Sequence, residues 1–285
     1  MKEIQTDIKT LQQETIKNLQ SSKANNTVRA YKSDFNDFSL FCAKNGFKDL
    51  PSDPKIISLY LTNLSTKDIK LSTIKRRLVS IGVIHRMKGQ YLDTKHPAIV
   101  ENLMGIKRRK GSAQKGKKPI LINNLRNILK AIDKEEIEDI KKLRDKSLIL
   151  IGFSGGFRRS EIVSLDYEDL DFVYEGLKIT VRRSKTDQFG EGSIKALPYF
   201  KESLYCPVTI LKKWLSISKI IKGPIFRRFS KGSKLSKYRL TDQTIALIIK
   251  KYLEKAGVDS KNYSGHSLRS GFATTAAESG AEERN

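Results

Sequence analysis

A short stretch near the end of this 285-residue chain, Ser264-Gly-His-Ser-Leu-Arg-Ser-Gly-Phe-Ala-Thr-Thr275, organises the rest of the sequence. His266 and Arg269 are three residues apart, so on a helix the imidazole and the guanidinium share one face, one turn from each other. We expect Ser264 or Gly265 to cap this helix. Both basic side chains would then lie in a first turn whose free backbone N–H groups attract phosphate. An isolated His-x-x-Arg is also compatible with two solvated side chains on an ordinary amphipathic helix, so other motifs have to decide.

The charge balance indicates a polyanionic partner. The chain has 55 Lys and Arg against 31 Asp and Glu, which gives a formal net charge of +24 and a pI near 9.9. A folded chain with this charge repels itself unless it binds a polyanion, and nucleic acid is the leading class. The apolar runs are too short to span a bilayer, and the first residues lack the apolar core of a signal peptide. We therefore expect neither membrane association nor export.

The cysteines and histidines predict neither a disulfide nor a metal site. Cys42 and Cys206 lie far apart in segments with helical patterns, as expected of buried thiols in a reduced cytoplasmic protein. The three histidines, His85, His96 and His266, do not have the spacing of zinc ligands. We expect no metal and no cofactor.

Residues 1–105 have the pattern of an all-α domain. Apolar residues recur at helical spacing in segments 3–20, 27–44, 54–64, 74–88 and 97–104. Ser72 or Thr73 is the expected cap of the helix over 74–88. Four or five helices of this kind, joined by loops of ordinary length, predict a helical bundle.

The segment that follows, 106–118, is rich in Lys, Arg and Gly and has no periodicity typical of a core. It is therefore predicted to be a flexible cationic linker. Against a phosphate backbone, such a run would gain binding energy by releasing counterions.

Residues 119–285 predict a mixed α/β domain with a small antiparallel sheet. Alternating apolar and polar residues over 171–183, with Glu175-Gly176 as the turn, predict two strands, and 193–197 predicts a third. Trp214 is the expected core anchor of an amphipathic helix. Helices are expected over 124–133, 136–154, 159–165, 207–218 and 241–256, with a basic loop over 227–239.

Arg158 and Lys185 are further candidates for anion chemistry. Arg158 follows the Gly155-Gly156 break at the start of a short helix, where its side chain can be held rigidly. Glu161, three residues on, could brace that guanidinium from behind. Lys185 is expected at a hairpin tip, where a mobile ammonium could enter a cleft and donate a proton. Taken singly, each is also compatible with an ordinary solvated side chain.

Several motifs occur in a fixed order: the segment from Arg144 to Ile162, then Ser184-Lys-Thr-Asp187, Cys206-Pro-Val-Thr-Ile-Leu211 and Gly265-His-Ser-Leu-Arg269. The front half contributes Asn26-Thr-Val-Arg-Ala-Tyr31, Leu71-Ser-Thr-Ile-Lys-Arg-Arg77 and Gly105-Ile-Lys-Arg-Arg109. In this order they resemble the tyrosine recombinase, or phage integrase, family over nearly the whole chain from Asn26 onward. The resemblance implies a SAM-like core-binding domain over 1–105 and a catalytic domain over 119–285.

The resemblance also implies a site-specific recombinase that cleaves and rejoins DNA through a covalent 3′-phosphotyrosyl intermediate. Arg158 and Arg269 would hold the scissile phosphate, because forked guanidiniums form bidentate bonds with its oxygens. Lys185 would protonate the leaving 5′ oxygen, and His266 would position or relay a proton at the attacked phosphate.

The chain departs from the family pattern after the His-x-x-Arg helix, where the nucleophilic tyrosine should follow. No tyrosine follows Tyr263, so no nucleophile is assigned within residues 1–285. We expect a catalytic domain truncated at its C-terminus, which binds DNA without forming a covalent complex. Two alternatives stay open: a recombinase-derived DNA-binding protein or regulator without catalysis, and a structural basic protein that binds RNA.

Double-stranded DNA is the predicted partner, and the resemblance implies a homotetramer in a synaptic complex. The protein is expected in the cytoplasm, associated with the nucleoid when it is bound to DNA. Further basic side chains would contact the DNA backbone and set position and salt sensitivity more than sequence choice. These are Lys75, Arg76, Arg77, Lys107, Arg108, Arg109, Lys110, Arg159 and Arg183.

Overall fold

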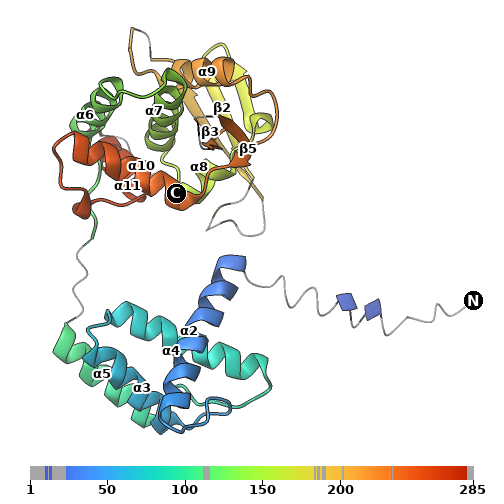
Figure 1. Cartoon of the computed structure of the whole chain (residues 1–285), viewed down its shortest axis with the longest axis vertical. Helices are drawn as coiled ribbons and strands as arrows, with labels where there is room; N and C mark the ends of the chain where they lie inside the picture. Colours follow the sequence, from blue (N-terminus) through green and yellow to red (C-terminus); the bar gives the residue numbers. More distant parts are fainter. Residues whose placement is uncertain are drawn as a thin grey trace, which may run out of the picture. The chain divides into compact units, whose positions relative to one another are not determined.

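The computed structural model describes residues 10, 11, 13, 14, 24–111, 116–182, 184, 187, 191–200, 202–230, 232 and 234–280. The chain divides into two compact units, Met1–Gln114 and Lys115–Asn285 (Figure 1). The predicted helix over 3–20 falls mostly outside the described residues. Within the described part, none of the helices is both long and apolar enough to cross a membrane.

The described part of the first unit contains four packed helices. They are α2 (Asn25–Lys44), α3 (Pro54–Thr66), α4 (Leu71–Met87) and α5 (Pro97–Lys110). α2 packs against α4, and α3 packs against α5. Phe38, Tyr60 and Ile81 are fully buried between them. This arrangement confirms the predicted all-α fold.

Two helix ends in this unit differ from prediction. α4 begins at Leu71, with Lys70 at its N-cap, and not after Ser72 or Thr73. α5 continues through the basic residues of the predicted linker to Lys110. Lys and Arg are good helix formers and are favourable at a helix C-terminus, and the fully buried Ile106 fixes these last turns to the bundle. Gly111, at a φ of 70°, ends the helix.

A buried carboxylate joins α2 to α4. Asp34 is only 4% exposed and accepts hydrogen bonds from Arg76 and from the Ser80 hydroxyl, the latter at 2.8 Å. Arg77 lies with its Nε 3.8 Å from the other Asp34 oxygen, and its Nη1 pairs with Asp37. Both arginines were predicted to contact DNA. In the structure both pair with carboxylates of α2, Arg77 with 18% of its side chain exposed and Arg76 with 48%.

Replacing this carboxylate tests its structural role. Asp34→Ala removes the carboxylate that accepts from Arg76 and from the Ser80 hydroxyl, whereas Arg77 keeps Asp37 and Tyr60 as partners. We therefore expect the first unit to lose about 1–3 kcal/mol of unfolding free energy. In the control Arg76→Ala, whose side chain is 48% exposed, the expected loss is below about 1 kcal/mol. Urea unfolding of the full chain, followed by far-UV circular dichroism, measures both. The single tryptophan, Trp214, lies in the second unit, and its fluorescence transition should not move. Equal losses in the two variants would contradict the assignment.

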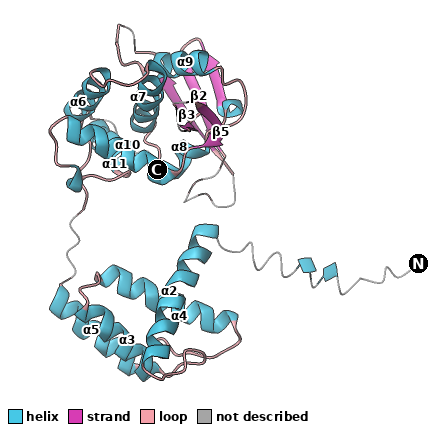
Figure 2. Ribbon diagram, viewed as in Figure 1, coloured by secondary structure: helices cyan, strands magenta, loops and turns pink. Residues whose placement is uncertain are grey.

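The second unit surrounds a long buried helix, α7 (Asp139–Ser154), that packs against α9 (Pro207–Ser218). Figure 2 shows the strands gathered on one side of this unit and α6 on the other. Trp214 of α9 is fully buried and donates a hydrogen bond from Nε1 to the Ile225 carbonyl at 2.9 Å, as expected of a core anchor. The remaining helices are α6 (Ile122–Asp133), α8 (Arg159–Ser164), α10 (Asp242–Lys255) and α11 (Ser267–Glu278).

The three predicted strands form one antiparallel sheet in the order β1-β2-β3. They are β1 (Leu170–Val173), β2 (Gly176–Val181) and β3 (Ser193–Pro198). Leu177, Ile179 and Val181 of β2 are buried on one face, as the alternation predicted. The small antiparallel sheet beside helices confirms the predicted mixed fold of this unit.

The predicted basic loop over 227–239 is instead a second, two-stranded sheet. β4 (Arg227–Phe229) pairs antiparallel with β5 (Leu235–Arg239). Phe229 and Leu235 lie opposite each other in the register and pack against the core of the unit. Two apolar residues among many cations are too weak a pattern to identify these strands from sequence.

Candidate anion-binding site

The turn Gly155-Gly156 connects the buried helix α7 to the short helix α8. Gly155 caps α7, and Gly156 has a φ of 56°, a left-handed conformation that favours glycine. A Cβ added to Gly156 would lie 2.8 Å from the ring of Phe272 in α11. The two glycines therefore permit a sharp turn and let α11 approach it closely.

Arg158 is the N-cap residue of α8, and Glu161 holds it in place. One Glu161 oxygen accepts from Arg158 Nη1 at 2.7 Å, and the other accepts from the Arg158 backbone N–H at 2.9 Å. Glu161 is 2% exposed, whereas the Arg158 side chain is 19% exposed. The buried carboxylate thus braces the guanidinium from behind, as predicted, and the partly exposed edge can receive an anion.

Arg269 reaches the same turn from α11. Its Nη1 donates a hydrogen bond to the Gly156 carbonyl at 2.8 Å. Close backbone packing fixes α11 in this position, because a Cβ at Gly271 would lie 2.0 Å from the Ile120 carbonyl oxygen. The structure therefore brings Arg158 and Arg269, distant in sequence, to one turn.

His266 lies at the start of α11, and the side chain of Arg159, from α8, reaches the same place. The N-cap is His266 itself and not the predicted Ser264 or Gly265. The exposed His266 donates from its backbone N–H to the Ser264 hydroxyl at 3.2 Å. A Cβ on Gly265 would lie 1.7 Å from Arg159 Cδ, so the arginine side chain rests against this glycine. Arg159 is thereby placed beside the His-x-x-Arg motif.

Lys195 of β3 is a member of this cluster that the sequence analysis did not identify. Its Nζ donates to the Gly155 carbonyl at 2.5 Å and lies 4.6 Å from the centroid of the Phe157 ring. Burial lowers the pKa of Lys195, the nearby charge of Glu161 opposes that shift, and Arg269 and Arg158 add to it. The one sequence feature that indicates Lys195 is its position two residues before the apolar Leu197, on the same face of the strand.

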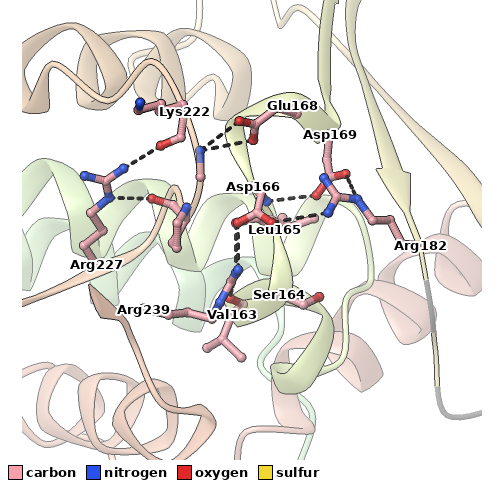
Figure 3. A network of polar contacts seen from close by, with 12 residues as sticks. Val163, Ser164, Leu165, Asp166, Glu168, Asp169, Arg182, Lys222, Arg227 and Arg239 are labelled. Atoms are coloured by element: carbon pink, nitrogen blue, oxygen red, sulfur yellow. Dashed lines mark hydrogen bonds and ion pairs between the residues drawn. The ribbon is translucent and has the colours of Figure 1, made fainter. Parts of the chain in front are cut away.

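A polar network fastens the far end of α8, as Figure 3 shows. Arg239 of β5 donates to the carbonyls of Val163 and Leu165, which end α8, and to Asp166 at 2.7 Å. Arg182 donates to Asp169 at 2.6 Å and lies 3.4 Å from Asp166. The last carbonyls of a helix have no partner within the helix, and here Arg239 supplies one. These bonds fix the position of α8, which begins directly after Arg158.

A second group of contacts lies beside this network. Glu168 accepts from the Gly223 backbone, and Arg227 donates to the carbonyls of Lys222 and Pro224 (Figure 3).

The other predicted site residues fall outside the described residues or in the first unit. Lys185 and Arg183 lie outside the described residues. The first unit contains Lys75, Arg76, Arg77 and Lys107 to Lys110. Lys75 and residues 107–109 are exposed, while Lys110 pairs with Asp68 at 2.9 Å.

The cluster is suited to holding a phosphate group. It combines two guanidiniums, one ammonium and the start of a helix, and guanidiniums form strong charge-assisted bonds with phosphate oxygens. Among the described residues, no group of three or more His, Cys, Asp or Glu could hold a metal ion.

Comparison with known proteins gives matches along most of the chain. The Phage integrase family matches residues 120–285. The integrase/recombinase xerD homolog of Selenomonas ruminantium is 42% identical over 263 residues, which cover 91% of this chain and 76% of that protein. Tyrosine recombinase XerC of Syntrophus aciditrophicus (strain SB) is 24% identical, with 94% of this chain and 83% of that protein covered.

Solved structures share the fold. The XerH recombinase bound to its difH substrate before cleavage gives a TM-score of 0.61 at 18% identity, covering 90% of this chain and 69% of that one. A lambda integrase dimer bound to a COC′ core site gives a TM-score of 0.59 at 14% identity, covering 93% of this chain and 69% of that one. The family match over the second unit, together with the relative at 42% identity, shows that this chain belongs to the phage integrase family of tyrosine recombinases.

Proposed function

We propose that this protein is a site-specific DNA recombinase that cleaves and rejoins strands through a covalent 3′-phosphotyrosyl intermediate. The observation that carries the proposal is the meeting of Arg158 and Arg269 at the Gly155-Gly156 turn, with the guanidinium of Arg158 braced by Glu161. This is the arrangement expected for a site that grips one phosphate group between two forked cations.

The chemistry follows from where charge develops. Attack on a phosphodiester gathers negative charge on the non-bridging oxygens, and each charge-assisted hydrogen bond to them contributes roughly 1.5–3 kcal/mol. Bonds that strengthen in the transition state raise the rate, so the two arginines would act mainly on cleavage. In the proposed reaction, Lys185 protonates the leaving 5′ oxygen, His266 positions or relays a proton at the phosphate, and a tyrosine supplies the nucleophile.

The proposed partner is double-stranded DNA, held in a synaptic complex of four protomers. The net charge of +24 supports a polyanionic partner. A lambda integrase tetramer bound to a Holliday junction shares the fold, with a TM-score of 0.53 at 17% identity. We place the protein in the cytoplasm, on the nucleoid when it is bound to DNA, with Lys75, Arg108 and Arg109 among the backbone contacts.

Arginine substitutions test the phosphate site. In a chain that also carries the nucleophilic tyrosine, Arg158→Ala and Arg269→Ala should each lower the rate of strand cleavage by about 10²–10³, because each removes a donor to the developing charge. Arg126→Ala, an exposed arginine on α6, is the matched control and should cleave at the parent rate. Single-turnover cleavage of bound DNA gives the rates. A parent-like rate in Arg158→Ala would remove the site assignment.

A second experiment uses residues 1–285, in which no tyrosine follows Tyr263. We expect this polypeptide to bind duplex DNA and to form no covalent adduct with a nicked suicide substrate. If about six phosphates are neutralised, affinity should fall on the order of 10³ between 50 and 200 mM salt. Gel analysis under denaturing conditions detects adducts, and competition by structured RNA tests the alternative of an RNA-binding protein. A trapped adduct, or RNA that competes as well as duplex DNA, would contradict this expectation.

A further inference from the structure

Lys195 occupies an unfavourable position for a lysine. In strand β3 it shares a face with Leu197, which is 3% exposed, and it is paired across the sheet with the fully buried Ile179. Its neighbour Ile194 points the other way and is 70% exposed. The sheet thus turns an isoleucine outward and a lysine inward, although placing an ammonium on the apolar face costs desolvation energy.

The contacts of Lys195 lead to the Gly155-Gly156 turn. Its ammonium donates to the Gly155 carbonyl, and Arg269 donates to the next carbonyl, that of Gly156. Two cations from β3 and α11 therefore hold consecutive carbonyls of the backbone that leads into Arg158. With Glu161 bonded to Arg158 from the other side, each end of this short segment is fixed by a named contact.

The charges around Lys195 argue against a purely structural role. Burial lowers its pKa, the charge of Glu161 opposes that shift, and the adjacent Arg269 and Arg158 add to it, so the buried ammonium carries a cost that Glu161 offsets in part. A neutral apolar residue of similar length would fit the sheet face without this cost. Positions where a sequence breaks the local pattern in this way are expected at functional sites.

We propose that Lys195 is a positioning residue for the phosphate site, which acts by fixing the turn that carries Arg158. The inference rests on the proposed function. Lys195 binds the Gly155 carbonyl and thereby fixes the backbone that leads into Arg158. The guanidinium of Arg158 is then already in position when a phosphate group binds. Loss of Lys195 would leave the turn freer and weaken anion binding through Arg158.

A double-mutant cycle on the full chain tests this role. The probe is inorganic phosphate at low ionic strength, and its Kd is obtained from the NMR shifts of the guanidinium Nε–H groups, which remain observable in every variant through Arg269. Lys195→Met should raise the Kd about 3- to 30-fold in the parent background. In the Arg158→Ala background the same substitution should change the Kd by less than about 2-fold, because the residue through which it acts is absent.

Two controls separate positioning from general effects. Lys212→Met removes a lysine that lies over the rings of Phe172 and Tyr199, and it should leave the Kd unchanged. The melting temperature of Lys195→Met should stay within about 4 °C of the parent, because relief from burial offsets the lost hydrogen bond. A large fall in melting temperature with an unchanged Kd would show a structural role and overturn the proposal.

The outcomes also distinguish this inference from the proposed function. If Lys195→Met weakens phosphate binding equally in both backgrounds, Lys195 acts independently of Arg158 and the positioning role is overturned, while the phosphate site stands. If Arg158→Ala alone binds phosphate as tightly as the parent, the phosphate site itself is wrong, and the positioning role fails with it.

Discussion

Like charges have to be held together around the Gly155-Gly156 turn, and this constraint governs the second unit. Arg158, Arg269 and Lys195 repel one another, and Glu161 is the buried carboxylate that offsets them. The backbone supplies the rest of the compensation through the carbonyls of Gly155 and Gly156. A phosphate group would complete this balance, since it brings the negative charge that the cluster lacks. In the proposed phosphate site, the charge repulsion that costs stability is the same property that would attract an anion.

Much of the fold could be predicted because apolar periodicity is local. The three-stranded sheet and α9 were found close to their observed limits, since Leu177, Ile179 and Val181 alternate cleanly and Pro207 marks a helix start. The β4–β5 hairpin was missed because Phe229 and Leu235 are its main apolar signal among cations. The predicted end of α5 comes too early because a run of Lys and Arg has the composition of a linker, although these residues favour helices and Ile106 is buried among them.

The candidate site could be predicted only where a motif named its residues. The motifs assign Arg158 and Arg269 to one phosphate, and in the structure Arg269 contacts the Gly155-Gly156 turn that leads into Arg158, with Glu161 bonded to Arg158. Lys195 could not be found in that way, because its role depends on contacts between β3 and a turn distant in sequence. Charge counting also overestimates the cations available to a partner. Arg144, for example, is buried against Asp145 and stacks on Phe229, so it serves the core.

The helical state of residues 107–110 changes what that basic run can recognise. Successive residues of an α-helix are rotated by about 100°, so these four cations point to all sides of the α5 axis. A flat anionic surface can meet only part of them at once, and Lys110 is already engaged by Asp68. A grooved polyanion that curves around the helix end can meet more of them, and from several rotational orientations. This end of α5 is therefore suited to tolerant electrostatic contact, whereas the braced arginines of the second unit demand one geometry.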